Sequence, residues 1–241
     1  MTFCIGIRVD AGIVVLSDTR VVTGSETSRK SKLSTLTDGR SEAVVMTSGL
    51  RSVRDKVVAR MQDRLSSGVE FDRFHEFASA YGDELRAVRA EDEPSLAEGG
   101  LTFDSHAILA GRFPGDVDPV LMHVYPEGNW VEATDDAPYF VIGRSSYGKP
   151  ILDRLLRAGS TLEHAISLAY LAFDATAASS TDVDFPIDIG VQPRDQEDFT
   201  MQRFTQNDME AVHAAWHDHL HAALDRLPTP WSELVGTERS A

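Results

Sequence analysis

Short apolar runs separated by polar turns predict strands at the start of the chain. Residues 3–9 and 13–17 are apolar runs of strand length, and Asp10-Ala11-Gly12 between them is typical of a hairpin turn. The polar stretch 19–31 is predicted to be a loop, and residues 42–47 form a further apolar run of strand length. We therefore expect a β-hairpin, a long polar loop and a third strand.

Two helices are predicted next, because the apolar residues now recur at a helical spacing. Residues 50–65 carry Val53, Val57 and Met61 at four-residue spacing, and residues 71–90 show a second apolar helical face. The acidic stretch 90–100 contains Pro94 and ends in two glycines. Its composition favours a loop between a helix and a strand over a linker between two domains.

The second half of the chain repeats this order of strands followed by helices. Strands are expected at 105–111, 120–125, 130–133 and 139–142, and later at 186–191 and 199–204. Helices are expected at 150–156, at 162–173 with Thr161 as N-cap, and at 208–227. Runs of strands followed by runs of helices favour antiparallel sheets over alternating βαβ units. Two stacked sheets with helices outside fit this order.

The charge of the chain narrows the classes of partner. Its 241 residues include 38 acidic and 23 basic side chains, which gives a formal net charge of −15. Such a surface repels phosphate backbones and anionic lipids, so neither nucleic acid nor a membrane is an expected partner. No apolar run reaches the roughly 20 residues of a membrane helix, and the first residues are not typical of a signal peptide. The expected location is the cytoplasm.

Metal and cofactor chemistry has weak support in the sequence. Cys4 is the sole cysteine, which excludes an intrachain disulfide and a cysteine-rich zinc site. His213, His217 and His221 recur at four-residue spacing, where two imidazoles on one helix face could share a metal. No nearby cysteine completes such a site and no glutamate occupies the metalloprotease position, so a solvated helix face is favoured. We expect no metal and no organic cofactor.

Thr2 is the first candidate for chemistry. Initiator methionine is readily removed before a small residue, and the mature chain would then begin with Thr2. Its hydroxyl and a free α-amine would share one residue, and an amine with a pKa of ~7.7–8.0 can act as a base near neutral pH. A threonine with an N-terminal amine is a known nucleophile–base pair. Many chains begin with Met-Thr by chance, so Thr2 alone is weak support for catalysis.

Three further residues would complete a reaction centre. Asp18 follows the second predicted strand, which would return it to the start of the chain. Lys32 follows the polar loop, and Gly49 lies at a strand-to-helix junction, where a backbone N–H can face an anion. With Thr2 they supply a nucleophile, a charge partner, a cation and an oxyanion donor. The alternative for Asp18 and Lys32 is a surface ion pair worth about 0–1 kcal/mol.

This arrangement resembles the proteasome β-subunit family of N-terminal nucleophile hydrolases. Members begin with a threonine and continue through a strand, a turn and a strand that ends at an acidic residue. A lysine followed by an aliphatic residue comes next, and then an Ala/Ser-Gly-Leu element. The resemblance covers residues 2–50, and it assigns the family's acid, lysine and oxyanion glycine to Asp18, Lys32 and Gly49.

The likeness is closer to the bacterial Anbu branch, the ancestral β-subunit-like proteins. The residues that carry it are Phe140-Val141-Ile142-Gly143, Tyr147-Gly148-Lys149-Pro150-Ile151-Leu152-Asp153-Arg154, Phe173-Asp174-Ala175-Thr176, Pro186-Ile187-Asp188 and Leu227-Pro228-Thr229-Pro230-Trp231. The resemblance implies an α+β fold, a four-layer αββα sandwich of two antiparallel sheets, as a single peptidase domain over residues 1–241. It also implies a homo-oligomer, either a ring or an open helical assembly.

The same resemblance assigns two supporting residues. The family's second acid falls on Asp174 and its supporting serine falls on Ser145, with Ser146 as the near alternative. A further family serine, three residues after that acid, is Ala177 in this chain. Thr176 could substitute for it, or the hydrogen bond could be missing.

The expected function is that of a threonine-type endopeptidase that hydrolyses peptides or unfolded proteins. Two alternatives stay open. One is a ring-forming scaffold or binding protein with little turnover, and the other is an amide hydrolase of the same fold that acts on a small molecule. The sequence does not identify a partner unfoldase.

Overall fold

Two five-stranded antiparallel sheets form the middle of the fold in the computed structural model, which describes residues 2–23 and 26–235. The first sheet has the strand order β10-β1-β2-β11-β12. Its strands are β1 (Phe3–Val9), β2 (Gly12–Asp18), β10 (Tyr139–Gly143), β11 (Ile187–Pro193) and β12 (Thr200–Phe204). The second sheet has the order β5-β6-β7-β8-β9. Its strands are β5 (Leu33–Thr37), β6 (Glu42–Gly49), β7 (Ser105–Arg112), β8 (Val120–Val124) and β9 (Trp130–Glu132).

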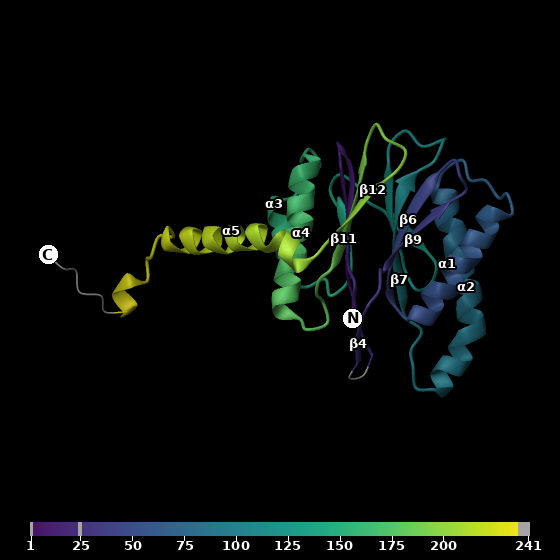
Figure 1. Cartoon of the computed structure of the whole chain (residues 1–241), viewed down its shortest axis with the longest axis horizontal. Helices are drawn as coiled ribbons and strands as arrows, with labels where there is room; N and C mark the ends of the chain where they lie inside the picture. The colour runs from purple at the N-terminus through teal and green to yellow at the C-terminus, as the bar shows by residue number, and fades with distance from the viewer. Residues whose placement is uncertain (1, 24–25, 236–241) are drawn as a thin grey trace. The chain divides into compact units, whose positions relative to one another are not determined.

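Helices cover the outer faces of these sheets. Two of them, α1 (Arg51–Ser66) and α2 (Phe74–Glu98), pack on the second sheet. On the other side, α4 (Leu162–Ser179) packs on β1 and β2, and α3 (Lys149–Leu155) packs on α4. Figure 1 shows the two helix layers on opposite sides of the paired sheets. This arrangement confirms the predicted α+β class and the four-layer αββα sandwich of two antiparallel sheets.

Burial explains why these segments adopt their elements. Val53, Val57 and Met61 are buried in the core between α1, α2 and the second sheet, as their four-residue spacing predicted. β1 and β2 are buried over nearly their whole length, because α4 covers one face of the first sheet and the second sheet covers the other. A strand that is buried on both faces reads as a continuous apolar run, which is how both strands read in the sequence.

The prediction of a loop over residues 19–31 is wrong for the described part of that stretch. It contains a separate two-stranded hairpin, β3 (Arg20–Thr23) and β4 (Glu26–Arg29), in which Arg20 pairs with Arg29. The hairpin is not part of a buried sheet, so its strands need no apolar face. Its polar sequence therefore lacks the pattern that predicts a strand. The edge strand β5 was missed for a related reason, since it pairs on one side only and is partly exposed.

The prediction of a loop over residues 90–100 is wrong up to residue 98, because α2 continues through Pro94. Proline has no N–H to donate to the carbonyl one turn earlier, which usually ends a helix. Ion pairs connect the turn of α2 just before Pro94 to α1. Lys56 Nζ lies 2.5 Å from Asp92 Oδ1, and Arg60 Nη2 lies 2.7 Å from Glu91 Oε2. Local composition does not reveal such contacts between helices.

The chain divides into two compact units, the first ending at Thr205 and the second beginning at Gln206. The second unit contains α5 (Gln206–Asp225), which confirms the predicted last helix, and the short 3-10 helix η1 (Ser232–Val235). The single peptidase domain over residues 1–241 stays a prediction. None of the described helices combines the length and the apolar content that a membrane span requires.

Candidate active site

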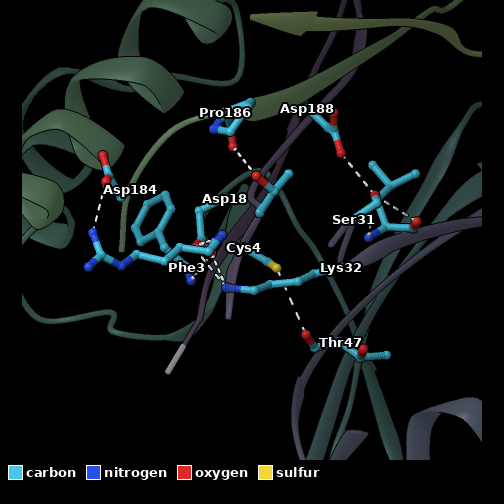
Figure 2. Close-up of polar contacts among 12 residues, drawn as sticks. Phe3, Cys4, Asp18, Ser31, Lys32, Thr47, Asp184, Pro186 and Asp188 are labelled. Carbon is cyan, nitrogen blue, oxygen red and sulfur yellow. Dashed lines mark hydrogen bonds and ion pairs between the residues drawn. The ribbon is translucent and has the colours of Figure 1, made fainter. Parts of the chain in front are cut away.

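Asp18 and Lys32 form a buried ion pair at the end of β2. The two carboxylate oxygens of Asp18 lie 2.6 and 2.7 Å from Lys32 Nζ. The side chain of Asp18 is 0% exposed and that of Lys32 is 5% exposed. Figure 2 shows the two side chains pointing toward one another between the strands. The pair is therefore shielded from water, unlike the surface ion pair that the sequence left as the alternative.

Asp18 also binds the backbone on both sides of the site. Its Oδ1 accepts the N–H of Phe3 at 2.8 Å, and its Oδ2 accepts the N–H of Arg20 at 3.1 Å. Burial raises the pKa of the Asp18 carboxyl above its ordinary value, while the Lys32 ammonium and these N–H groups act in the opposite direction. One carboxylate thus fixes the start of β1, the start of β3 and the lysine.

Lys32 lies where the two sheets meet. Its carbonyl accepts the N–H of Thr47 on β6 at 3.3 Å, which ties it to the second sheet. The neighbouring Ser31 donates its hydroxyl to Asp188 Oδ2 on β11 at 2.9 Å, which ties the same segment to the first sheet. These bonds explain how a lysine just outside β5 comes to face an aspartate in the other sheet (Figure 2).

The end of β10 fixes the position of the Thr2 backbone. Its carbonyl accepts the N–H of Arg144 at 2.8 Å, and Phe3 pairs with Gly143. Gly143 has a φ of +85°, and a Cβ at this position would lie 1.9 Å from the Thr2 carbonyl oxygen. Only glycine fits here, because both the backbone conformation and the space exclude a side chain.

Thr2, Lys32 and Gly49 line one cavity of about 460 Å³. Gly49 ends β6 with a φ of +110°, and a Cβ there would lie 2.2 Å from the carbonyl oxygen of Asp104. The glycine therefore lets the chain turn sharply from β6 into α1 at the wall of the cavity. The structure brings together Thr2, Lys32 and Gly49 around this space, with Asp18 buried behind the lysine.

Ser145 and Asp174 are not among the described residues that line the cavity. Ser145 is half-buried in the turn after β10, and its N–H donates to the carbonyl of Gly143 at 3.0 Å. Asp174 is half-buried on α4, next to Phe173, whose ring packs edge-on against that of Phe3 at 6.2 Å. Both residues are therefore close in the chain to groups that position Thr2.

Cys4 is a further side chain near the site that could act as a nucleophile. It is fully buried between the sheets, with its Sγ 4.0 Å from the carbonyl oxygen of Thr47. Burial raises the pKa of the Cys4 thiol, and the nearby Lys32 only partly opposes this. A buried neutral thiol is a weak nucleophile, so the cysteine fits a packing role.

Sequence reasoning missed three charged residues of the cavity wall. Lys30, Arg54 and Asp104 line the cavity with the predicted residues. Arg54 could have been found, because it lies about one helical turn after Arg51 at the start of α1, and so on the same side of the helix. Lys30 follows β4 and Asp104 precedes β7, and the local sequence does not indicate that these two segments reach the same cavity.

The histidines of α5 are exposed on the helix surface. His217 and His221 place their Nε2 atoms 3.0 Å apart. Within residues 2–23 and 26–235, no group of three or more histidine, cysteine, aspartate or glutamate side chains is arranged to hold a metal ion.

Comparison with known proteins reveals close structural relatives. No protein-family model and no curated protein matches the chain. Among solved structures it is similar to the Gly-1 mutant of Anbu from Hyphomicrobium sp. strain MC1, with 32% identity, a TM-score of 0.85, and coverage of 95% of this chain and 98% of that one. It is also similar to the helical assembly of the Anbu complex from Pseudomonas aeruginosa, with 31% identity, a TM-score of 0.88, and coverage of 96% and 99%. Anbu (ancestral β-subunit) from Yersinia bercovieri matches with 29% identity, a TM-score of 0.86, and coverage of 94% and 97%.

Proposed function

Because the chain belongs to the Anbu family of ancestral β-subunits, we propose that it is a threonine-type peptidase with Thr2 as its nucleophile. The observation that supports this most directly is the cavity shared by Thr2, Lys32 and Gly49, with Asp18 bound to the lysine. Acyl transfer needs a nucleophile, a group that stabilises its negative charge and a donor to the oxyanion. The Thr2 hydroxyl, the Lys32 side chain and the Gly49 backbone would supply these around one cavity.

In this proposal Thr2 acts after Met1 has been removed. Met1 lies outside the described residues. The free α-amine of Thr2 would accept the proton of its own Oγ, directly or through one water, as Oγ attacks the carbonyl carbon of a peptide bond. The leaving amine takes a proton as the C–N bond breaks, and an ester on Thr2 remains. Water then hydrolyses this ester and regenerates the threonine.

Lys32 and Gly49 would stabilise the charges that develop. The Lys32 side chain would favour negative charge on Thr2 Oγ, and its ion pair with Asp18 fixes its position. The N–H of Gly49 is the proposed donor to the oxyanion, a contact worth about 2.7–4 kcal/mol in comparable enzymes.

Ser145 and Asp174 are proposed to orient the amine and to relay protons. The family serine three residues after that acid is Ala177 here. Thr176 was the candidate substitute, but it is buried and its hydroxyl donates to the carbonyl of Ala172 in its own helix at 2.7 Å. We therefore propose that the amine is oriented without a hydroxyl from this part of α4.

The substrate is proposed to be a peptide or an unfolded protein, cleaved without a metal or an organic cofactor. We propose that the subunits associate with one another in the cytoplasm. The supporting observation is that the relative from Pseudomonas aeruginosa forms a helical assembly.

The test is the intact mass of the purified protein before and after treatment with a β-lactone that acylates N-terminal threonine. We expect loss of Met1 and the gain of one adduct, with peptide turnover that Thr2→Ala reduces to background. Thr2→Ser keeps a hydroxyl and serves as the matched control, so it should retain both adduct and turnover. Retention of Met1, or turnover that is unchanged in Thr2→Ala, would contradict the proposed mechanism.

A scaffold with little turnover remains the second candidate. It is favoured by Ala177 and by the occupied hydroxyl of Thr176, because both remove support from the amine of Thr2. An adduct on Thr2 without cleavage of any peptide would support this candidate. Cleavage of small amides but not of extended peptides would instead identify a small-molecule hydrolase.

A further inference from the structure

Positive charge is concentrated around the cavity of an otherwise acidic protein. Among the residues that the structure describes, the cavity is lined by Lys30, Arg51 and Arg54 besides Lys32, and by one carboxylate, that of Asp104. The whole chain carries a formal net charge of −15. A cluster of cations makes the electrostatic potential at the cavity positive, although the chain as a whole is negatively charged. A positive potential favours an anionic ligand.

The two arginines share one carboxylate. Arg51 Nε lies 3.2 Å from Asp55 Oδ2, and Arg54 Nη2 lies 2.7 Å from Asp55 Oδ1. One negative charge cannot neutralise two guanidinium groups, so one positive charge remains in excess. The side chain of Arg54 is 16% exposed, and its Nη1 contacts the carbonyl oxygen of Ser31 at 3.5 Å. It is therefore held in a fixed position at the wall of the cavity, whereas Arg51 is 52% exposed and can adjust to a ligand.

Lys30 adds a further charge to this wall. Its backbone is fixed by an N–H bond to the carbonyl of Thr19 at 2.8 Å, and its side chain forms no ion pair with any described residue. Asp104 is partly engaged, because its Oδ1 lies 3.6 Å from Nε2 of His106. The cations of the cavity wall thus outnumber the carboxylates available to them.

We propose that this cavity selects substrates with a carboxylate side chain, Asp or Glu, on the residue that supplies the attacked carbonyl. The inference rests on the proposed peptidase function. That residue remains bound to Thr2 as the ester while the amine leaves, so its side chain occupies the space near Thr2 during both steps. Arg51 and Arg54 lie on the same cavity as Thr2 and Gly49, and a guanidinium binds a carboxylate through charge-assisted hydrogen bonds. A lysine or arginine side chain in this position would meet like charge and be rejected.

The test compares fluorogenic peptides that differ only in the residue before the scissile bond: Glu, Gln, Leu and Lys. With the mature protein we expect kcat/KM to be about 10-fold or more higher for Glu than for its neutral isostere Gln, and lowest for Lys. The ratio of Glu to Gln should fall when the salt concentration rises from about 0.1 M to 1 M, because salt screens partly exposed charges. A Glu/Gln ratio near one, or a preference for Leu or Lys, would overturn the inference.

Substitutions at Arg51 test whether its charge produces the preference for a carboxylate side chain. Arg51→Gln should lower the Glu/Gln ratio toward one, and Arg51→Glu should move the preference toward the Lys peptide. Arg51 is half exposed, so these changes are compatible with folding. Arg40→Gln is the matched control, because Arg40 is an exposed arginine paired with Glu70 outside the cavity, and its removal should leave the ratio unchanged. An unchanged ratio in both Arg51 variants would contradict the assignment.

A second measurement separates this inference from the proposed function. Peptide aldehydes that end in Glu or Gln should protect Thr2 from the β-lactone, and the Glu aldehyde should do so at about a 10-fold lower concentration. This readout requires a reactive Thr2 but no peptide turnover. Equal protection by both aldehydes would overturn the inference and leave the nucleophile in place. No adduct and no cleavage of any peptide would overturn the proposed function, and the inference with it.

Discussion

At the scale of single residues, the position of Thr2 depends on a glycine that touches it. Gly143 and Gly39 have nearly the same backbone conformation, with φ values of +85° and +86°. A Cβ at Gly143 would collide with the Thr2 carbonyl, whereas a Cβ at Gly39 would meet nothing within 4 Å. An alanine at Gly39 would show the effect of an unfavourable φ alone, whereas an alanine at Gly143 would add the effect of displacing Thr2.

We predict that Gly143→Ala lowers peptide turnover far more than Gly39→Ala does. Backbone strain should reduce the free energy of unfolding of both variants by about 1–2 kcal/mol, and the collision with the Thr2 backbone should reduce that of Gly143→Ala further. Only Gly143→Ala should also reduce kcat/KM, by about 100-fold, because a shift of about 1 Å misaligns a reacting group. Urea unfolding and peptide turnover of both variants check this. Equal turnover in the two variants would show that Thr2 tolerates the displacement.

At the scale of elements, the sequence predicted the helices and strands that a local pattern of apolar residues specifies. The spacing of Val53, Val57 and Met61 gave α1, and the run of apolar residues gave β1 and β2, because burial alone specifies them. The hairpin β3–β4 was missed because it lies outside the buried sheets and has a polar sequence, and the end of α2 was missed because it contacts residues distant in sequence. The same holds for the site. Thr2, Asp18, Lys32 and Gly49 lie at or next to strand ends, which is why the sequence could suggest them as a group, whereas Lys30, Arg54 and Asp104 reach the cavity only through the tertiary fold.

Pro94 gives a test of how the end of α2 is stabilised. The proline is exposed within the helix and leaves the carbonyl one turn earlier without its usual donor. We predict that Pro94→Ala raises the free energy of unfolding by roughly 1–3 kcal/mol, which corresponds to ~2–4 °C in Tm per kcal/mol for a chain of this size.

Calorimetry measures this change, with Ser95→Ala as the control at the next exposed helix position. That control should alter stability by less than about 0.5 kcal/mol. A lower Tm for Pro94→Ala would show that the proline contributes to packing between α2 and its neighbours.

At the scale of the whole molecule, a pair of histidines lies where the two sheets face each other. His123 on β8 places its Nε2 3.1 Å from Nδ1 of His106 on β7. The His123 ring is 5.5 Å from that of Phe140 on β10 in the first sheet and 4.4 Å from that of Tyr125. Burial and, second, the charge of His106 lower the pKa of His123 from 6.5 to about 4. The contact between the sheets thus favours the neutral form of the His123 imidazole.

Stability should therefore fall as the pH drops from about 6.5 to about 4. In that range the unfolded chain binds a proton at His123 that the folded chain excludes, so acid favours unfolding by at most about 1.4 kcal/mol per pH unit. His123→Phe should remove this contribution and flatten the pH dependence of the free energy of unfolding. Urea titrations between pH 7.5 and 4.5 measure it, with the exposed His164→Gln as control. The same slope in the wild type and in His123→Phe would contradict the assignment.

The division of the site between the two sheets has a consequence for the protein during its own synthesis. Thr2 and Asp18 come from the first sheet, whereas Lys32 and Gly49 come from the second. Until the two sheets have packed together, Thr2 is separated from the proposed cation and from the proposed oxyanion donor. In a cell full of unfolded nascent polypeptides, the proposed peptidase is thus harmless to them until its own maturation is complete.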